Sequence, residues 1–213
     1  MKTFTAAIFD LDGVIIDSTE AHRESWKIVL AEYGLEFNEE KFIETFGIKN
    51  DDVVPLLFGK TDPDEIVVIA DKKEAAYRDE FRRLPVLVPG IEEYLRYLKD
   101  RSIPLAVASS APKKNIDMTF ELYSFMDLFD TVVEADDVVN GKPHPEVFLK
   151  AADNLGIKPN QTVVFEDAIA GVEAGKAAGM FVVALATSHP PEDLKNADLI
   201  VSDFTDPQLQ ELF

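Results

Sequence analysis

"AAIFDLDGVIIDS", residues 6–18, is an apolar segment that ends in acidic side chains. The first part is typical of a buried strand, yet Asp10, Asp12 and Asp17 follow it closely. A carboxylate removed from water must be paired, bound to a metal or protonated. We therefore predict a strand over residues 4–10 whose carboxyl end either reaches the surface or carries a functional site.

Short apolar runs and helical patterns alternate from residue 90 to the C-terminus. Such alternation predicts parallel strands joined by helices that cover both faces of one sheet. Gly171, Gly175 and Gly179 are spaced by four, which we interpret as close packing of a helix against the sheet, with Gly179 as its end. We predict helices at 90–100, 113–123, 145–155 and 168–178, and strands at 103–109, 130–133, 162–166, 181–185 and 198–202.

Between these parts, residues 17–84 show helical spacing and no convincing strand. In "TEAHRESWKIVLAEYG" (19–34), apolar residues recur at i, i+3, i+4 and i+7, and further helices are predicted at 39–46, 51–58 and 64–83. We predict an α/β protein with a doubly wound, Rossmann-like parallel sheet as its core and an inserted all-helical cap domain. The core would comprise residues 1–16 plus 85–213, and the cap residues 17–84.

The composition is that of a globular protein, with 213 residues, 46% hydrophobic residues and 29% charged residues. Forty acidic against 21 basic residues give a net charge of −19, which repels nucleic acid and anionic membranes. No apolar run is long enough to span a bilayer, and Asp10 comes too early for a signal peptide. Without cysteine there is no disulfide or thiolate chemistry. We expect a cytoplasmic monomer that binds neither nucleic acid nor membranes.

The residues that follow the predicted strands carry chemistry. Ligands of an open parallel sheet bind at the carboxyl ends of its strands. Four carboxylates gathered there need a cation, and oxygen ligands without cysteine or paired histidines favour Mg²⁺ over zinc. A lysine and a serine beside such a cation suit a phosphate group. The residues concerned are Asp10, Asp12, Ser109, Ser110, Lys142, Glu166 and Asp167.

An aspartate is the best candidate nucleophile. There is no cysteine, and no serine has a neighbouring histidine arrangement, whereas a carboxylate is already ionised at neutral pH and can accept a phosphoryl group. A second acid could protonate the leaving oxygen and later deprotonate water. Asp10 and Asp12 fit that division of labour. Each signal also has a structural interpretation, such as a turn at Asp10–Gly13 or a helix cap at Asp167; their order at successive strand ends favours the functional one.

Phe9–Val14 ("FDLDGV"), Ser109, Lys142–Pro143 and Glu166–Asp167 resemble the four motifs of the haloacid dehalogenase superfamily. The resemblance covers essentially the whole chain and includes the β-phosphoglucomutase-like group with its mobile helical cap. It implies that Asp10 is the nucleophile and Asp12 the general acid and base. It also implies a Mg²⁺ site formed by Asp10, the main-chain carbonyl of Asp12 and Asp167, supported by Glu166, and a phosphate site formed by Ser109, Ser110 and Lys142. Because Asp12 is present, the chain does not resemble the dehalogenase branch.

The cap segment resembles the mutases only in part. His22 and Trp26 are similar to the mutase His-x-x-x-Trp, and Lys73 with Tyr77 to a cap lysine segment, although Trp26 also fits a cap core position. The mutase loop Lys-Gly-x-Ser-Arg is here "FGIKN" (46–50), which lacks the arginine that would bind a second phosphate. Candidate substrate contacts are His22, Trp26, Gly47, Lys49 and Lys73.

We therefore expect a Mg²⁺-dependent phosphatase that hydrolyses a small phosphate monoester, such as a sugar phosphate, through an aspartyl-phosphate. A β-phosphoglucomutase that works through a sugar bisphosphate is the alternative. A catalytically silent regulator that binds phosphorylated ligands is a third hypothesis, which the complete motif set disfavours.

Overall fold

The computed structural model describes residues 4–60 and 62–213 and contains one six-stranded sheet. All neighbouring strands are parallel, in the order β3-β2-β1-β4-β5-β6, which confirms the predicted doubly wound core. The strands are short and almost wholly apolar, as expected for strands that are covered on both faces. They are β1 (Ala6–Phe9), β2 (Leu105–Ala108), β3 (Thr131–Val133), β4 (Thr162–Glu166), β5 (Phe181–Leu185) and β6 (Leu199–Val201).

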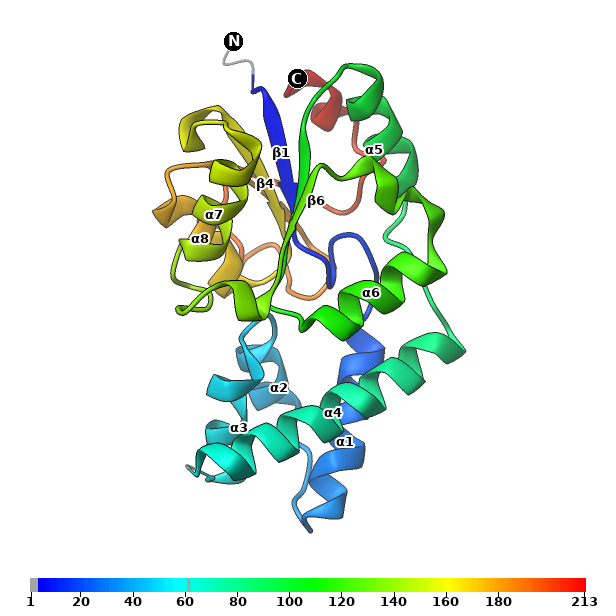
Figure 1. Cartoon of the computed structure of the whole chain (residues 1–213), viewed down its shortest axis with the longest axis vertical. Coiled ribbons are helices and arrows are strands. Elements are labelled where there is room, and N and C mark those ends of the chain that lie inside the picture. Colours follow the sequence, from blue (N-terminus) through cyan, green and yellow to red (C-terminus); the bar gives the residue numbers. More distant parts are fainter. Residues whose placement is uncertain (1–3, 61) are drawn as a thin grey trace.

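Helices cover both faces of the sheet, because successive strand residues point to opposite sides. In β1, Ala7 and Phe9 join the core under α5 and α6, whereas Ile8 joins the core under α7 and α8. Figure 1 shows these two pairs of helices on either side of the strands. Their bounds are α5 (Ile91–Asp100), α6 (Lys113–Leu122), α7 (Glu146–Leu155) and α8 (Ile169–Ala177).

Among the described residues between β1 and α5, four helices form the cap, a layer beyond the carboxyl ends of the strands (Figure 1). The cap has an apolar core of its own, centred on Trp26, Phe42 and Val54. This arrangement confirms the predicted helical insert, while the boundaries given for the two parts stay a prediction. The cap helices are α1 (Thr19–Glu32), α2 (Glu39–Thr45), α3 (Asn50–Phe58) and α4 (Pro63–Arg83).

The two chain segments that join cap and core run side by side. The amide of Asp17 donates to the carbonyl of Val86 over 2.9 Å, and the amide of Val88 donates to Ile15 over 3.1 Å. Ser18 occupies the N-cap position of α1, one residue after Asp17. Asp17 therefore belongs to the paired segments that join the cap to the core. Within the described ranges, no helix is both long and apolar enough to cross a membrane.

Candidate active site

The floor of the site is built from the ends of two neighbouring strands. Asp10 follows β1, and Glu166 ends β4, which pairs with β1 in the sheet. The ammonium of Lys142, from the segment before α7, donates to Asp10 Oδ1 over 2.7 Å and to Glu166 Oε1 over 2.5 Å. All three side chains are buried. The sheet thus brings together residues that lie more than 130 positions apart in the chain.

Asp167 completes a cluster of three buried carboxylates. Asp10, Glu166 and Asp167 each offer an oxygen, and these oxygens lie within 4.8 Å of one another. Glu166 Oε2 accepts from the amides of Asp167 and Ala168, at 2.7 and 2.8 Å, and Asp167 Oδ2 accepts from the hydroxyl of Ser188. Glu166 is thereby fixed by Lys142 on one side and by the start of α8 on the other.

The negative charge of these three carboxyl groups is not balanced by the single lysine beside them. Burial raises the pKa of Asp10 to about 7; Glu166 and Asp12 act in the same direction and Lys142 against it. Burial also raises the pKa of Asp167 well above its usual range, with Glu166 and Asp10 adding to the effect. One lysine does not balance three buried acids, and a divalent ion with hard oxygen ligands would do so.

Two glycines leave room for these carboxylates. A Cβ at Gly171 would overlap the carboxylate of Glu166, and a Cβ at Gly13 would overlap that of Asp167. Gly171 therefore packs closely against the sheet, as predicted, and the residue that it contacts at the end of β4 is the site residue Glu166. Gly175 also faces the sheet, at Val182, and Gly179 ends α8 with a positive φ of 76°.

The carboxylate of Asp12 points away from this cluster, toward the cap. Its Oδ1 accepts from the hydroxyl of Ser18 at 2.6 Å and that of Tyr77 at 3.1 Å, and it lies 3.0 Å from Nε2 of His22. Burial by itself would raise the pKa of Asp12, but His22, Ser18 and Lys73 outweigh it and hold the pKa at about 2. Asp12 is therefore an ionised group shared between core and cap.

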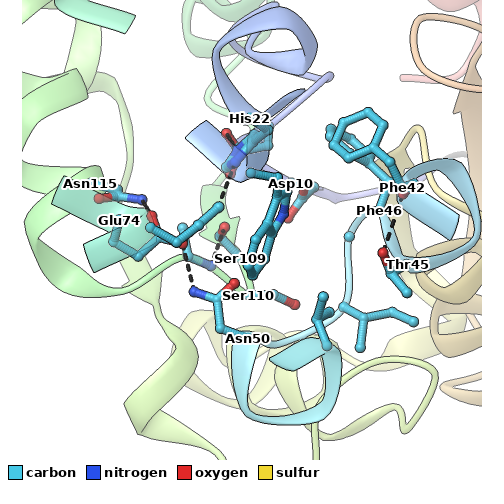
Figure 2. A pocket seen from close by; sticks show the side chains of 17 residues that line it. Asp10, His22, Phe42, Thr45, Phe46, Asn50, Glu74, Ser109, Ser110 and Asn115 are labelled. Carbon is cyan, nitrogen blue, oxygen red and sulfur yellow. Dashed lines mark hydrogen bonds and ion pairs between the residues drawn. The ribbon is translucent and has the colours of Figure 1, made fainter. Parts of the chain in front are cut away.

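A small cavity of about 60 Å³ lies above Asp10, between the core and the cap. Figure 2 shows Asp10 and Ser109 facing cap side chains across this space. Ordinary ligand pockets measure roughly 300–1,000 Å³, so the cavity is small in this structure. The lining residues are Asp10, Asp12, His22, Trp26, Phe42, Thr45, Phe46, Gly47, Ile48, Asn50, Val53, Lys73, Glu74, Ser109, Ser110, Ala111 and Asn115.

Most of the predicted contact residues meet at this cavity. Ser109 and Ser110 line it from the core, and His22, Trp26, Gly47 and Lys73 line it from the cap. Lys142 is not among the lining residues, but its ammonium is bonded to Asp10, which is. Trp26 belongs to the cap core and also lines the cavity, so a packing role and a place at the site are compatible for this residue.

Lys49 is the exception among the candidate substrate contacts. Its ammonium donates to the main-chain carbonyls of Ala135 and, over 2.9 Å, of Val138. It lines a neighbouring groove of about 410 Å³, outside the cavity. The side chain ties the cap to the core, because the carbonyls that it reaches precede Lys142 on the core loop.

The cavity wall also contains polar residues that were not predicted from the sequence: Thr45, Asn50, Glu74 and Asn115. Glu74, Asn50 and Asn115 are joined by hydrogen bonds, and they come from α4, α3 and α6 (Figure 2). Asn50 and Glu74 meet within the cap, and the placement of the cap on the core adds Asn115, so no local sequence pattern predicts the group. Ser188 follows the strand Phe181–Leu185, and extending the strand-end argument to that strand would have found it.

Comparison with known proteins shows which family this architecture matches. Residues 7–185 match the family described as "Haloacid dehalogenase-like hydrolase". The chain is 32% identical to validoxylamine A 7'-phosphate phosphatase of Streptomyces hygroscopicus subsp. limoneus over 95% of both proteins. It is also 32% identical to β-phosphoglucomutase of Bacillus subtilis over 97% of this chain and 93% of that protein.

A solved structure of β-phosphoglucomutase from Clostridium difficile superposes with a TM-score of 0.87 at 29% identity. The match covers 98% of this chain and 96% of that one. The family match, the two relatives and the shared fold agree over nearly the whole length. The chain therefore belongs to the haloacid dehalogenase-like hydrolase family.

Proposed function

We propose that this protein is a Mg²⁺-dependent phosphatase that hydrolyses a small phosphate monoester, such as a sugar phosphate, with Asp10 as nucleophile. One observation carries the proposal: the carboxylate of Asp10 lies on the floor of a capped cavity, bonded to Lys142 and grouped with Glu166 and Asp167. The relatives support the class, since one of the two named above is a phosphatase and the other is β-phosphoglucomutase.

The acidic cluster fits a magnesium ion. Its oxygens lie within 4.8 Å of one another, and burial and mutual repulsion raise the pKa of Asp10 and Asp167. The ion would be held by Asp10, Asp167 and the main-chain carbonyl of Asp12, with Glu166 in support. When bound, it supplies positive charge beside the phosphoryl oxygens.

The protein's own residues supply the remaining chemistry. Asp10 attacks phosphorus and the bond to the ester oxygen breaks. Asp12, which is ionised in this structure, takes up a proton from water as the substrate binds and delivers it to that oxygen. Asp12 then takes a proton from the water that attacks the aspartyl-phosphate, which releases inorganic phosphate and restores Asp10. Ser109, Ser110 and Lys142 hold the phosphoryl group during both steps. Closure of the cap keeps bulk water out until the second step.

Asn50 favours a phosphatase over a mutase. A mutase must bind a second phosphate at the cap, and a bidentate arginine is best suited to that task. Here the Asn50 amide instead donates to Glu74 over 2.6 Å. β-Phosphoglucomutase remains the second candidate, because a relative with that name matches the chain over 97% of its length.

The test is a phosphorus NMR time course with Mg²⁺, β-glucose 1-phosphate and a trace of glucose 1,6-bisphosphate. We expect inorganic phosphate to accumulate, and a panel of phosphate esters would then identify the preferred substrate. Glucose 6-phosphate without matching phosphate would instead establish the mutase. Chelation of Mg²⁺ should stop the reaction.

Two matched variants separate catalysis from a silent binding role. Asp10→Asn should abolish turnover, whereas Asp17→Asn changes an exposed acid of the same segment and should leave turnover intact. A wild-type protein that binds phosphate esters without turnover would contradict the enzyme proposal. A cytoplasmic location and a monomeric state stay predictions from the sequence.

A further inference from the structure

Glu74 places a buried carboxylate in the cavity wall, on the cap side. It is only 6% exposed, and three donors converge on it. Lys73 donates to Oε1 over 2.7 Å, Asn50 donates to Oε1 over 2.6 Å, and Asn115 of the core donates to Oε2. Burial by itself would raise the pKa of Glu74, but Lys73 and His22 outweigh it and lower the pKa, so the group is ionised at neutral pH.

The cap side of the cavity offers no uncommitted cation among the described lining residues. Lys73 is the lysine of that wall, and its ammonium is already bonded to Glu74 and to Nδ1 of His22. Trp26 and Phe46 contribute apolar surface. A second phosphate would therefore meet a carboxylate and aromatic rings, whereas hydroxyl groups would find amide and carboxylate partners at Asn50, Glu74 and Asn115.

Glu74 also marks where the cavity ends. Asn50 and Glu74 line both the cavity and the neighbouring groove of about 410 Å³, so their hydrogen bond lies between the two spaces. The groove carries basic side chains, among them Lys113 and Lys114. A longer anionic substrate would reach these lysines past the Asn50–Glu74 pair or past Ser110, which also lines both spaces.

We propose that Glu74 is a specificity-determining residue that admits phosphate monoesters with an uncharged, hydroxyl-bearing remainder and excludes substrates with a second anionic group. This inference rests on the proposed phosphatase function, because it assumes that Asp10 marks the phosphoryl end of the bound substrate. It predicts discrimination between a sugar monophosphate and the bisphosphate of the same sugar.

Binding measured without turnover provides the test. In an Asp10→Asn background with Mg²⁺, titration calorimetry compares the dissociation constants of glucose 1-phosphate and glucose 1,6-bisphosphate. We expect the monophosphate to bind at least about tenfold more tightly, and Glu74→Gln to shift the ratio about tenfold toward the bisphosphate by removing one nearby charge. Glu74→Ala, which also opens the way to the groove, should shift it at least as far.

Asn115→Ala is the matched control, because it removes a partner of Glu74 and keeps the carboxylate. It should weaken both ligands and leave their ratio within about twofold. Equal binding of the two ligands to the Asp10→Asn protein, or an unchanged ratio in both Glu74 variants, would overturn the inference. Absence of turnover in the NMR experiment with the predicted binding ratio would refute the phosphatase proposal alone.

Discussion

The hydroxyl of Tyr77, on the cap helix α4, donates a 3.1 Å hydrogen bond to Asp12, which belongs to the core. The Tyr77 ring also stacks on His22, with 4.0 Å between ring centroids and 13° between the planes. His22 in turn lies between Asp12 and Lys73. The charge of Asp12 is thus stabilised by side chains that the cap carries, so the state of the proposed acid and base depends on where the cap stands.

The lowered pKa of Asp12 predicts a pH-dependent contribution to stability. A carboxyl whose pKa falls from 3.8 to about 2 on folding stabilises the protein above pH 4, and this contribution is lost as the pH falls toward 2. Asp12→Asn should lower the free energy of unfolding by about 2 kcal/mol at pH 7. Urea unfolding at pH 7, 5 and 3 measures the difference from wild type, which should be constant down to about pH 4 and then shrink. Asp17→Asn is the control; an equal loss there would contradict this assignment.

Lys142 balances two buried carboxylates, and its removal should be costly. Lys142→Met leaves Asp10 and Glu166 without their shared ammonium, and breaking a buried ion pair typically costs about 3–5 kcal/mol. We expect a loss of that order in urea unfolding in the presence of a chelator, together with loss of turnover. The double variant Lys142→Met/Glu166→Gln removes one of the stranded charges and should recover part of the stability but not the activity. Equal stability of the single and double variants would show that the charges are not the cause.

Gly171 makes room for Glu166, so a single methyl group there should disturb the site. In Gly171→Ala the new Cβ would overlap the Glu166 carboxylate, which holds Lys142. We expect kcat to fall at least about tenfold and the protein to lose about 1–3 kcal/mol of stability, the usual range for overpacking. Glu173→Ala, at an exposed position of the same helix, serves as control and should leave both quantities unchanged. Full activity in Gly171→Ala would show that Glu166 does not position the ammonium of Lys142 for catalysis.

Asn115 joins the core helix α6 to the cap helix α4. Its amide donates to Glu74, and its carbonyl accepts from Arg78 over 2.9 Å. Hydrogen bonds to charged groups contribute about 1.5–3 kcal/mol, so Asn115→Ala should favour the open cap and raise KM about tenfold or more. Fluorescence of Trp26, the single tryptophan and a cavity residue, should report the weaker closure on addition of phosphate. Lys114→Ala, one residue away and exposed, is the control. If both variants showed the same KM, the hydrogen bonds of Asn115 to Glu74 and Arg78 would have no role in closure of the cap.

The strands and helices could be predicted closely from the sequence, because local patterns determine them. Strands β4 and β5 begin and end at the predicted residues, since each contains a short run of consecutive apolar residues, rich in valine, that is typical of a buried parallel strand. The strand-end argument also identified Asp10, Lys142, Glu166 and Asp167 as neighbours, because parallel strands bring their carboxyl ends to one edge.

The cap side of the site could not be predicted in the same way. Lys49 and Asn50 are adjacent in sequence, yet one bonds to a core loop and the other to Glu74. Which of two adjacent side chains faces the cavity depends on how α3 sits over the core, and no periodicity within α3 contains that information. The same holds for Glu74 and Asn115, which lie 41 positions apart on helices of different layers.

The pairing of the two segments that join cap and core determines how the cap can differ between related chains. The chain leaves the core at Ile15–Asp17 and returns at Val86–Val88, and the two segments are hydrogen-bonded to each other. The cap is joined covalently to the core through these two segments alone. Its length and shape therefore place no strain on the six-stranded sheet. A different cap joined through the same two segments would leave the sheet and the carboxylates of Asp10, Glu166 and Asp167 in place, but it would have to supply new partners for Asp12.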